Sequence, residues 1–403
     1  MMRLSDWTSV VLFVCFHIIS SSHVPSADTL PFNISKSTPE GDPNYIAPIF
    51  PILPFRKYHH NPVLTPNPAH DWESAYVYNP AAIVLNETIF LLYRAQNASK
   101  TSSIGLAWSV DGYNFTRLNE PVLYATLPWE AGGGTEDPRI VRVNGTFYLT
   151  YTAYDLNVPR LCIATSDDLL HWTKVPPLFQ GSDNVHVADN GTRVSRFDHT
   201  KSGAIITEQT SDGLYHMYFG DSVFYHSTSS DLVNWSTSSE PFATPMNPWE
   251  NGLIEPGPAP IKTRDGRWLL IYNGMTTGEA GYRPTQYSVG QMLLDPSASL
   301  RPAHNNDNDN DNQNHARKHF RHPDPEDQSV LFAPHSNHRR PATDRPLARL
   351  ETPFMVPSTP EEESGQVDLV VFAEGLVQFR GKWFLYYGQA DKTIGVAVAD
   401  VQQ

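Results

Sequence analysis

Residues 145–155 read GTFYLTYTAYD, and this apolar and aromatic run ending in tyrosine is repeated in four other stretches. The other copies are TIFLLYRAQN (88–97), GLYHMYFGD (213–221), GRWLLIYNG (266–274) and GKWFLYYGQAD (381–391). Several copies follow a turn signal, for example Asn144-Gly145, which favours a tight hairpin before a strand. Each copy is therefore predicted to be the second strand of a β-hairpin.

The tyrosines of these repeats lie 58, 67, 54 and 115 residues apart. This spacing is too uneven for a short solenoid repeat but fits four-stranded units with loop insertions. Five copies predict an all-β fold, a five-bladed β-propeller over residues 61–403. The long last interval contains residues 302–345, which are rich in Asn, Asp, His and Arg and poor in apolar residues. This segment is predicted to be a disordered insertion.

A second pattern, Ser-x-Asp followed four residues later by an aromatic residue, occurs three times. It places Asp111, Asp168 and Asp231 before Phe115, Trp172 and Trp235. Aspartate in such a turn accepts backbone N–H bonds, and the aromatic ring fills space between sheets. These aspartates are therefore predicted to be structural.

Composition excludes several classes of protein. With 40% hydrophobic and 18% charged residues in 403, the chain can bury a sizeable core and is neither fibrous nor a coiled coil. The net charge of −14 repels phosphate backbones and anionic lipid surfaces, so nucleic acid is not an expected partner.

The N-terminus has the pattern of a secretory signal peptide. Arg3 precedes an apolar run at 10–19, which is too short to span a membrane, and small residues follow at 20–22. We expect a signal peptide at 1–22, an irregular lead-in at 23–60 and a secreted protein without a membrane anchor. Seven Asn-x-Ser/Thr sequons agree with a glycoprotein, at Asn33, Asn86, Asn97, Asn114, Asn144, Asn190 and Asn234. Cys162 is the only cysteine beyond the signal and is expected to be buried and structural.

Polar residues gather where the repeated strands end and in the loops that precede them. The candidate site residues among them are Asn79, Arg94, Glu136, Asp137, Lys201, Asp221, Glu255, Asn273, Glu374 and Asp391, and Arg139 and Asp155 lie at similar positions. In a propeller such positions converge on a central pocket, and the nearby Trp72, Trp129 and Trp249 could stack on sugar rings. The set suits a neutral polyhydroxylated ligand. The glycines at 132–134 lack the Lys-Ser/Thr of a phosphate-binding loop, and no metal or organic cofactor is expected.

Several motifs together resemble those of glycoside hydrolase family 130. They are NPAA (79–82) with LLYRAQ, TEDPRI with YLTYTAYD, HTKSGAI around Lys201, PAPIKT (258–263), and YYGQAD near the C-terminus. The resemblance covers about residues 61–400 apart from the insertion. It implies a five-bladed propeller that acts on β-mannosides, with Asp137 as the general acid.

Departures from the phosphorylase branch of this family indicate the reaction. That branch typically has HR after the third repeated strand and YHG after the fourth, where this chain has FGD (219–221) and YNG (272–274). Acids such as Asp221 and Glu255 repel phosphate but can orient and deprotonate water. The pattern is similar to that of the hydrolytic branch, whose members resemble β-1,2-mannosidases. We therefore expect inverting hydrolysis, with Asp221 and Glu255 together as the base and Glu374 and Glu208 as lesser candidates.

Three alternatives stay open at this stage. One is a mannoside phosphorylase, which would form mannose 1-phosphate. Another is a propeller glycosidase for arabinan or fructan. The third is a non-catalytic propeller that binds a mannose-containing oligosaccharide without turnover. The aglycone, exo or endo action and the oligomeric state do not follow from the sequence.

Overall fold

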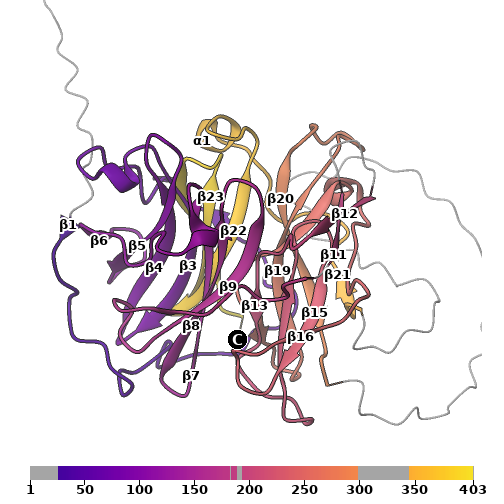
Figure 1. Cartoon of the computed structure of the whole chain (residues 1–403), viewed down its shortest axis with the longest axis horizontal. Helices are drawn as coiled ribbons and strands as arrows, with labels where there is room; N and C mark the ends of the chain where they lie inside the picture. The colour runs from indigo at the N-terminus through magenta and orange to yellow at the C-terminus, as the bar shows by residue number, and fades with distance from the viewer. Residues whose placement is uncertain (1–25, 182, 188–192, 298–344, 403) are drawn as a thin grey trace, which may run out of the picture.

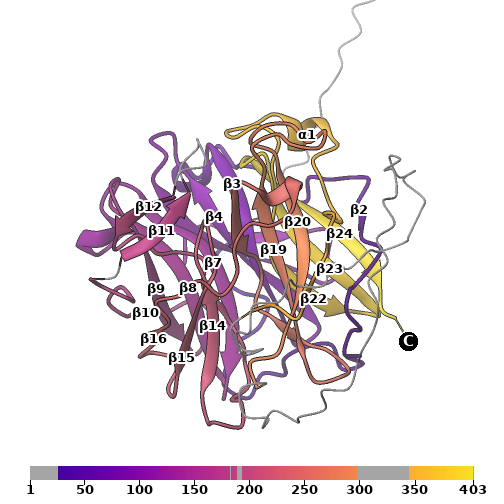
Figure 2. The ribbon, with the colours of Figure 1, turned by 90° about the vertical axis from the view of Figure 1, so that its right-hand side faces the viewer.

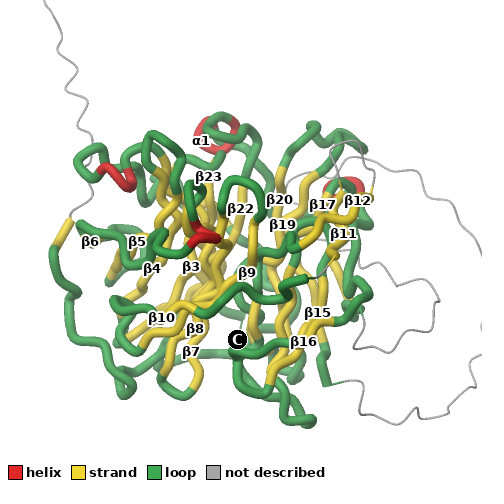
Figure 3. Tube along the Cα trace, in the orientation of Figure 1, coloured by secondary structure: helices red, strands yellow, loops and turns green. Residues whose placement is uncertain are grey.

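The structure is a computed structural model that describes residues 26–181, 183–187, 193–297 and 345–402 (Figure 1). The predicted signal peptide lies outside the described residues, as does the predicted insertion except for Arg345. The fold is nearly all-β. Figure 3 shows the short helical turns among the strands, which are η1 (Asp71–Glu73), η2 (Pro128–Glu130), η3 (Pro248–Glu250) and α1 (Pro360–Glu363).

Within the described residues the strands form five antiparallel units, which follow chain order except for β2 (Arg56–Lys57). The first two units are β3 (Tyr76–Leu85), β4 (Thr88–Gln96), β5 (Ser102–Ser109) and β6 (Thr116–Leu118), then β7 (Gly134–Val143), β8 (Thr146–Tyr154), β9 (Pro159–Ser166) and β10 (Thr173–Lys174). A single parallel pair, Ser102 with Gly134, joins them into one nine-stranded sheet, and β1 (Ser26–Ala27) is added beside β6.

Three separate sheets make up the other units. The third contains β13 (Ala204–Ile205), β14 (Tyr215–Phe219), β15 (Tyr225–Ser229) and β16 (Ser236–Thr237). The fourth contains β17 (Leu253–Pro256), β18 (Ile261–Lys262), β19 (Trp268–Met275), β20 (Tyr287–Leu294) and β21 (Ala348–Arg349). The fifth contains β22 (Val371–Phe379), β23 (Lys382–Gln389), β24 (Thr393–Asp400) and β2 (Arg56–Lys57). A two-stranded hairpin, β11 (Asp183–Val187) and β12 (Arg193–Phe197), precedes the third unit.

Each repeated run in the sequence forms the strand that pairs with the first strand of its unit, and this first strand, here called the innermost strand, is β3, β7, β13, β17 or β22. The predicted runs correspond to β4, β8, β14, β19 and β23, so the prediction of five repeated strands is confirmed. The lead-in at 23–60 is less irregular than expected, because β2 pairs with β24 and completes the last unit (Figure 2). The N-terminal and C-terminal parts of the chain therefore share one sheet.

Among the described residues, five apolar clusters hold the units together, and each lies between two neighbouring units. The cluster around Leu92 and Leu149 lies between units one and two, and the cluster around Ile163 and Met217 lies between units two and three. Equivalent clusters join the third unit to the fourth, the fourth to the fifth and the fifth back to the first. Burial of these side chains is the main stabilising contribution.

In the first, second and fifth units the repeated tyrosine is held by a buried carboxylate from the helical turn before the unit. The tyrosine hydroxyl donates to this carboxylate at 2.8 Å in three pairs: Tyr93 with Glu73, Tyr151 with Glu130, and Tyr387 with Glu362. A basic residue of the outer strand binds the same carboxylate: Arg117 at 2.8 Å, Lys174 at 2.7 Å and Lys57 at 2.6 Å, respectively. In the fourth unit Arg349 pairs with Glu250 and lies over the ring of Tyr272. These contacts tie the inner part of a unit to its outer edge.

The Ser-x-Asp turns have the predicted structural role. Asp111 Oδ1 accepts the backbone N–H groups of Tyr113 and Asn114, each at 2.8 Å, and Asp168 and Asp231 make the equivalent bonds. Cys162 is also buried, as expected.

Candidate functional site

Three of the innermost strands contain a β-bulge. At each bulge a polar side chain no longer follows the regular alternation of side chains between the two faces of the sheet. The register shifts at Asn79 in β3, within residues 137–138 in β7, and at Glu374 in β22. Asn79 and Asp137 both have φ of 47°, in the left-handed region that Asn and Asp tolerate better than most residues. A β-bulge re-aims a side chain in this way. Bulges thus set the directions of three candidate residues from three different units.

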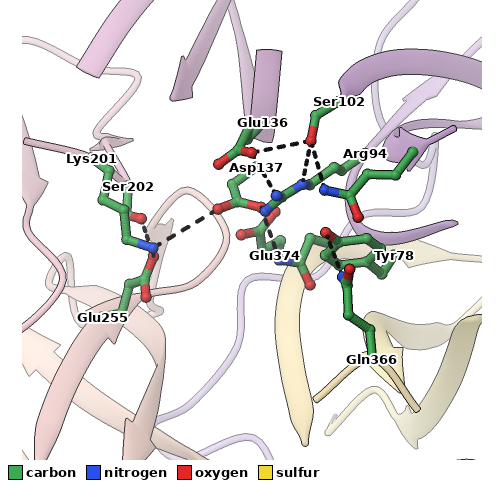
Figure 4. Close-up of polar contacts among 12 residues, drawn as sticks. Tyr78, Arg94, Ser102, Glu136, Asp137, Lys201, Ser202, Glu255, Gln366 and Glu374 are labelled. Atoms are coloured by element: carbon green, nitrogen blue, oxygen red, sulfur yellow. Dashed lines mark hydrogen bonds and ion pairs between the residues drawn. The ribbon is translucent and has the colours of Figure 1, made fainter. Parts of the chain in front are cut away.

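Asp137 lies at the centre of a hydrogen-bonded group (Figure 4). Its Oδ1 accepts from Asn79 Nδ2 at 2.9 Å and from Arg94 Nη1 at 3.0 Å. Arg94 also donates to Glu136 at 2.6 Å and to the hydroxyl of Ser102 at 3.0 Å. The guanidinium therefore fixes two neighbouring carboxylates at once.

Lys201 connects Asp137 to the fourth unit. Its Nζ lies 3.2 Å from Glu255 Oε1 and 4.0 Å from Asp137 Oδ2. The hydroxyl of Ser202 also donates to Glu255. Both acids are almost fully buried, whereas Lys201 is partly exposed. The ammonium group therefore lies between the two carboxylates that were predicted to act as acid and base.

Arg139 forms the inner wall of the site. Its Nη2 lies 2.9 Å from Glu374 Oε1 and 3.9 Å from Glu255 Oε1, and it donates to the backbone oxygen of Pro256 at 2.7 Å. Within the described residues the oxygens of Glu374 have no partner with hydrogen-bond geometry, so this contact is an ion pair only. The same guanidinium thus faces two acids of different units.

Burial and neighbouring charges shift the pKa of Asp137 in the opposite direction from the pKa values of Glu255 and Glu374. Burial alone would raise the pKa of Asp137, but Arg94, Lys201 and Arg139 outweigh it and hold that pKa well below its usual range. Burial raises the pKa of Glu255 and raises that of Glu374 well above its usual value, because their cationic neighbours offset it only in part. Asp137 is therefore the most acidic of these three carboxyl groups.

Asp391 and Asp221 lie at the edge of this group and are partly exposed. Burial raises the pKa of Asp391 to about 7; Arg94 opposes this shift, whereas Asp137 reinforces it. Asp221 interacts electrostatically with Lys201 and Glu255 and accepts a 3.3 Å hydrogen bond from Ser222. The structure thus brings together nine of the ten predicted site residues, all except Asn273.

The amide of Asn273 serves a different purpose from the predicted one. Its Nδ2 donates to the backbone oxygen of Ala373 at 3.1 Å, and its Oδ1 accepts from the N–H of Ala373 at 2.8 Å. Both amide atoms therefore link the fourth unit to the fifth.

Glu208 and two of the tryptophans also lie elsewhere. Glu208 is exposed, pairs with Lys262 and lines a cavity of about 340 Å³ between the other ends of the innermost strands. Trp72 stacks on Tyr93 at 6.1 Å, and Trp249 is fully buried. The expectation that these two rings stack on a sugar is wrong, because they pack within the units.

The sequence analysis missed Ser102 and Ser202, and it placed Arg139 only among the polar residues near the site, as a possible ion-pair partner of Glu136 and Asp137. The sequence does contain a pattern that indicates where the site lies. A polar residue precedes Pro or Gly within an apolar strand at 79–80, 137–138, 255–256 and 374–375. Pro and Gly inside a strand are associated with bulges. This signal marks the inner strands and the positions where their side chains are redirected.

The described residues carry neither a cluster suited to a metal ion nor a membrane-spanning helix. No group of three or more His, Cys, Asp or Glu side chains there is arranged to hold a metal ion. No helix in the same part of the chain is long and apolar enough to cross a membrane.

Comparison with known proteins decides the family. The family model for glycoside hydrolase family 130, described as β-1,4-mannooligosaccharide phosphorylase, matches residues 54–302 and 341–403. The chain belongs to glycoside hydrolase family 130. The family 130 motifs therefore coincide with the group around Asp137, and this enzyme family acts on β-mannosides.

Individual relatives include both phosphorylases and hydrolases. A 1,2-β-oligomannan phosphorylase from Thermoanaerobacter sp. (strain X514) is 28% identical over 362 residues, covering 87% of this chain and 99% of the relative. A glycosyl hydrolase structure from Bacteroides ovatus is 31% identical with a TM-score of 0.67, covering 89% and 97%.

One further solved structure bears on the two activities. It is reported with the statement that the GH130 family of mannoside phosphorylases contains glycoside hydrolases that target β-1,2-mannosidic linkages in Candida mannan. It is 30% identical to this chain with a TM-score of 0.68, and the match covers 89% of this chain and 98% of that one.

Proposed function

We propose that this family 130 protein is a five-bladed β-propeller that hydrolyses β-mannosidic linkages, β-1,2 in particular, with inversion. The cyclic order of the five apolar clusters supports the propeller, because each unit packs on the next and the fifth packs on the first. The N-terminal pattern and the sequons support a secreted glycoprotein.

The charge of the site is the observation that favours hydrolysis. Its three cations are already matched with carboxylates: Arg94 with Glu136 and Asp137, Lys201 with Glu255, and Arg139 with Glu374. A phosphate dianion would have to compete with these acids and would also meet Asp221 and Asp391. Each like charge a few ångströms away costs about 1–4 kcal/mol for dielectrics between those of water and a protein surface. Water meets no such penalty.

The proposed reaction uses two carboxyl groups on opposite sides of the anomeric carbon. Glu255 and Asp221 take a proton from water as its oxygen bonds to that carbon, while Asp137 supplies a proton to the leaving oxygen, directly or through a sugar hydroxyl. The glycosidic bond breaks, the mannosyl unit is released as α-mannose, and the rest of the substrate leaves as an alcohol that carries the proton from Asp137. Asn79, Arg94, Glu136, Lys201, Glu374 and Asp391 hold the sugar.

Protonation of Asp137 is the step that the substrate must assist. Without a ligand, Arg94 and Lys201 keep this carboxyl ionised. A sugar hydroxyl that takes the place of either cation weakens this stabilisation and allows Asp137 to hold a proton. The raised pKa of Glu255 suits a group that must accept one.

Phosphorolysis is the second candidate function. It is supported by the names of the curated relatives, which are phosphorylases.

One experiment separates the two reactions. Purified protein is incubated with β-1,2-, β-1,3- and β-1,4-mannobiose, with and without inorganic phosphate. We expect free mannose from the β-1,2 substrate at a rate independent of phosphate. Mannose 1-phosphate as the main product would replace hydrolysis with phosphorolysis, and no turnover of any mannoside would contradict both.

A further inference from the structure

A cavity of about 350 Å³ lies beside the second unit, outside the group around Asp137. Its polar walls are Asp155, Arg160, Gln180 and Asp198, and its aromatic wall is Trp129. None of these residues contributes to the proposed chemistry.

Two chain segments run directly from this cavity into the site. Trp129 belongs to η2, which leads through the glycines at 132–134 into β7 and Glu136. Asp198 precedes Lys201 by three residues, and Thr200 binds β9 through the backbone oxygen of Pro159 at 3.0 Å.

The strand register sets the distance between cavity and site. Thr152 in β8 pairs with Glu136, and Asp155 follows three residues later, roughly 10 Å farther along at the usual rise per residue. The cavity therefore lies within reach of an oligosaccharide whose end is bound at Asp137.

The second unit differs from the first and fourth at the residue that pairs with the repeated tyrosine, and this difference explains why Trp129 lies at the cavity. In the first unit Trp72 covers Gly105, the residue that pairs with Tyr93, and a Cβ at Gly105 would come within 2.6 Å of the indole. The fourth unit repeats this arrangement with Trp249 over Gly290.

The second unit has Cys162 at the corresponding position, paired with Tyr151. Since a Cβ occupies the space that the tryptophan fills in the other two units, Trp129 cannot take that position. Its ring contributes to the cavity wall instead.

The polar side chains of the cavity are held in place before any ligand binds. Asp155 Oδ1 accepts from the N–H groups of Asn157 and Val158, and Asp155 Oδ2 accepts from Arg160 Nη1 at 2.7 Å. A guanidinium has five N–H donors, more than these contacts use. Gln180 is exposed and adds a carboxamide.

We propose that this cavity is a distal sugar-binding subsite that holds a hexose of a longer oligosaccharide while the terminal sugar is bound at Asp137. Fixed carboxylate, guanidinium and amide groups beside an aromatic ring suit a neutral polyol, and the two carboxylates disfavour an anion. This inference rests on the proposed function, because it assigns the cavity to the same substrate.

The test compares short and long substrates. The kcat/KM of the wild type is measured on β-1,2-mannobiose, which supplies only one hexose besides the one at Asp137, and on β-1,2-mannotetraose. Trp129→Ala and Gln180→Ala should each lower the value for the tetraose by about three- to tenfold and change the value for the biose less than about twofold. Trp129→Phe should restore part of the loss because it keeps an aromatic face.

Met246→Ala is the control for loss of an exposed apolar side chain outside the cavity. Met246→Ala, at an exposed position before η3 in the fourth unit, should leave both substrates unaffected. Because Trp129 also packs on a core cluster, Gln180→Ala decides the matter if Trp129→Ala does not fold. Equal changes on the two substrates, or no change on the tetraose, would overturn the subsite alone. A wild type that cleaves neither substrate would overturn the proposed function and this inference with it.

Discussion

Asp391→Asn should make the protein more stable at neutral and alkaline pH. In the folded protein the pKa of Asp391 is raised from 3.8 to about 7, chiefly by burial. A carboxyl whose pKa is raised on folding favours the folded state most below pH 3.8. That contribution is lost as the pH rises toward 7, where the folded protein must ionise the group.

The size of the effect follows from the shift. A change of about 3 pKa units corresponds to about 4 kcal/mol at 1.36 kcal/mol per unit. Asp391 is partly exposed, and solvent screening lowers this figure, so we expect a gain of about 2 kcal/mol at pH 8. The gain should be close to zero at pH 4, where the wild-type side chain is neutral in the folded protein.

Urea denaturation of the wild type and the variants at pH 2.5, 4, 6 and 8 measures this difference directly. Asp111→Asn is a matched control of opposite sign. Burial opposes the shift, but hydrogen bonds from Asn114 and Tyr113 hold the pKa of Asp111 at about 2. That control should lose stability at pH 8 and recover as the pH falls from 3.8 to 2. A pH-independent difference for Asp391→Asn, or a loss at pH 8, would refute the reasoning.

Three other predictions follow from the same structure. Asp137→Asn should keep the fold and lower kcat on an unactivated mannoside by about 10²–10⁴-fold, so more than a tenth of wild-type activity would remove its assignment as acid. Tyr151→Phe should lower the free energy of unfolding by about 1.5–3 kcal/mol, since the hydroxyl donates to the buried carboxylate of Glu130. Tyr218→Phe should have a much smaller effect, because that hydroxyl has no partner among the described residues; equal losses in denaturant titrations would contradict this account. Proton NMR of the first product, recorded before mutarotation, should show α-mannose, and β-mannose would instead imply a covalent intermediate.

The sequence by itself determined the repeat and the composition of the site. Five runs of apolar and aromatic residues, several of them after a turn signal, predict five strands, because these signals are local and do not depend on the neighbouring strands. The Ser-x-Asp turns were predictable for the same reason: each aspartate binds N–H groups two and three residues later. Motifs in a fixed order also identified the family.

Only the tertiary structure decided how those residues meet. The bulges at Asn79, Asp137 and Glu374 depend on pairing with a second strand, so the direction of these side chains is not a local property. The pKa of Asp137 is low because cations from three units surround it, and their distances are set by packing. Asn273 was misassigned for the same reason: an amide suits sugar and backbone equally well, and only the position of Ala373 shows which one it binds.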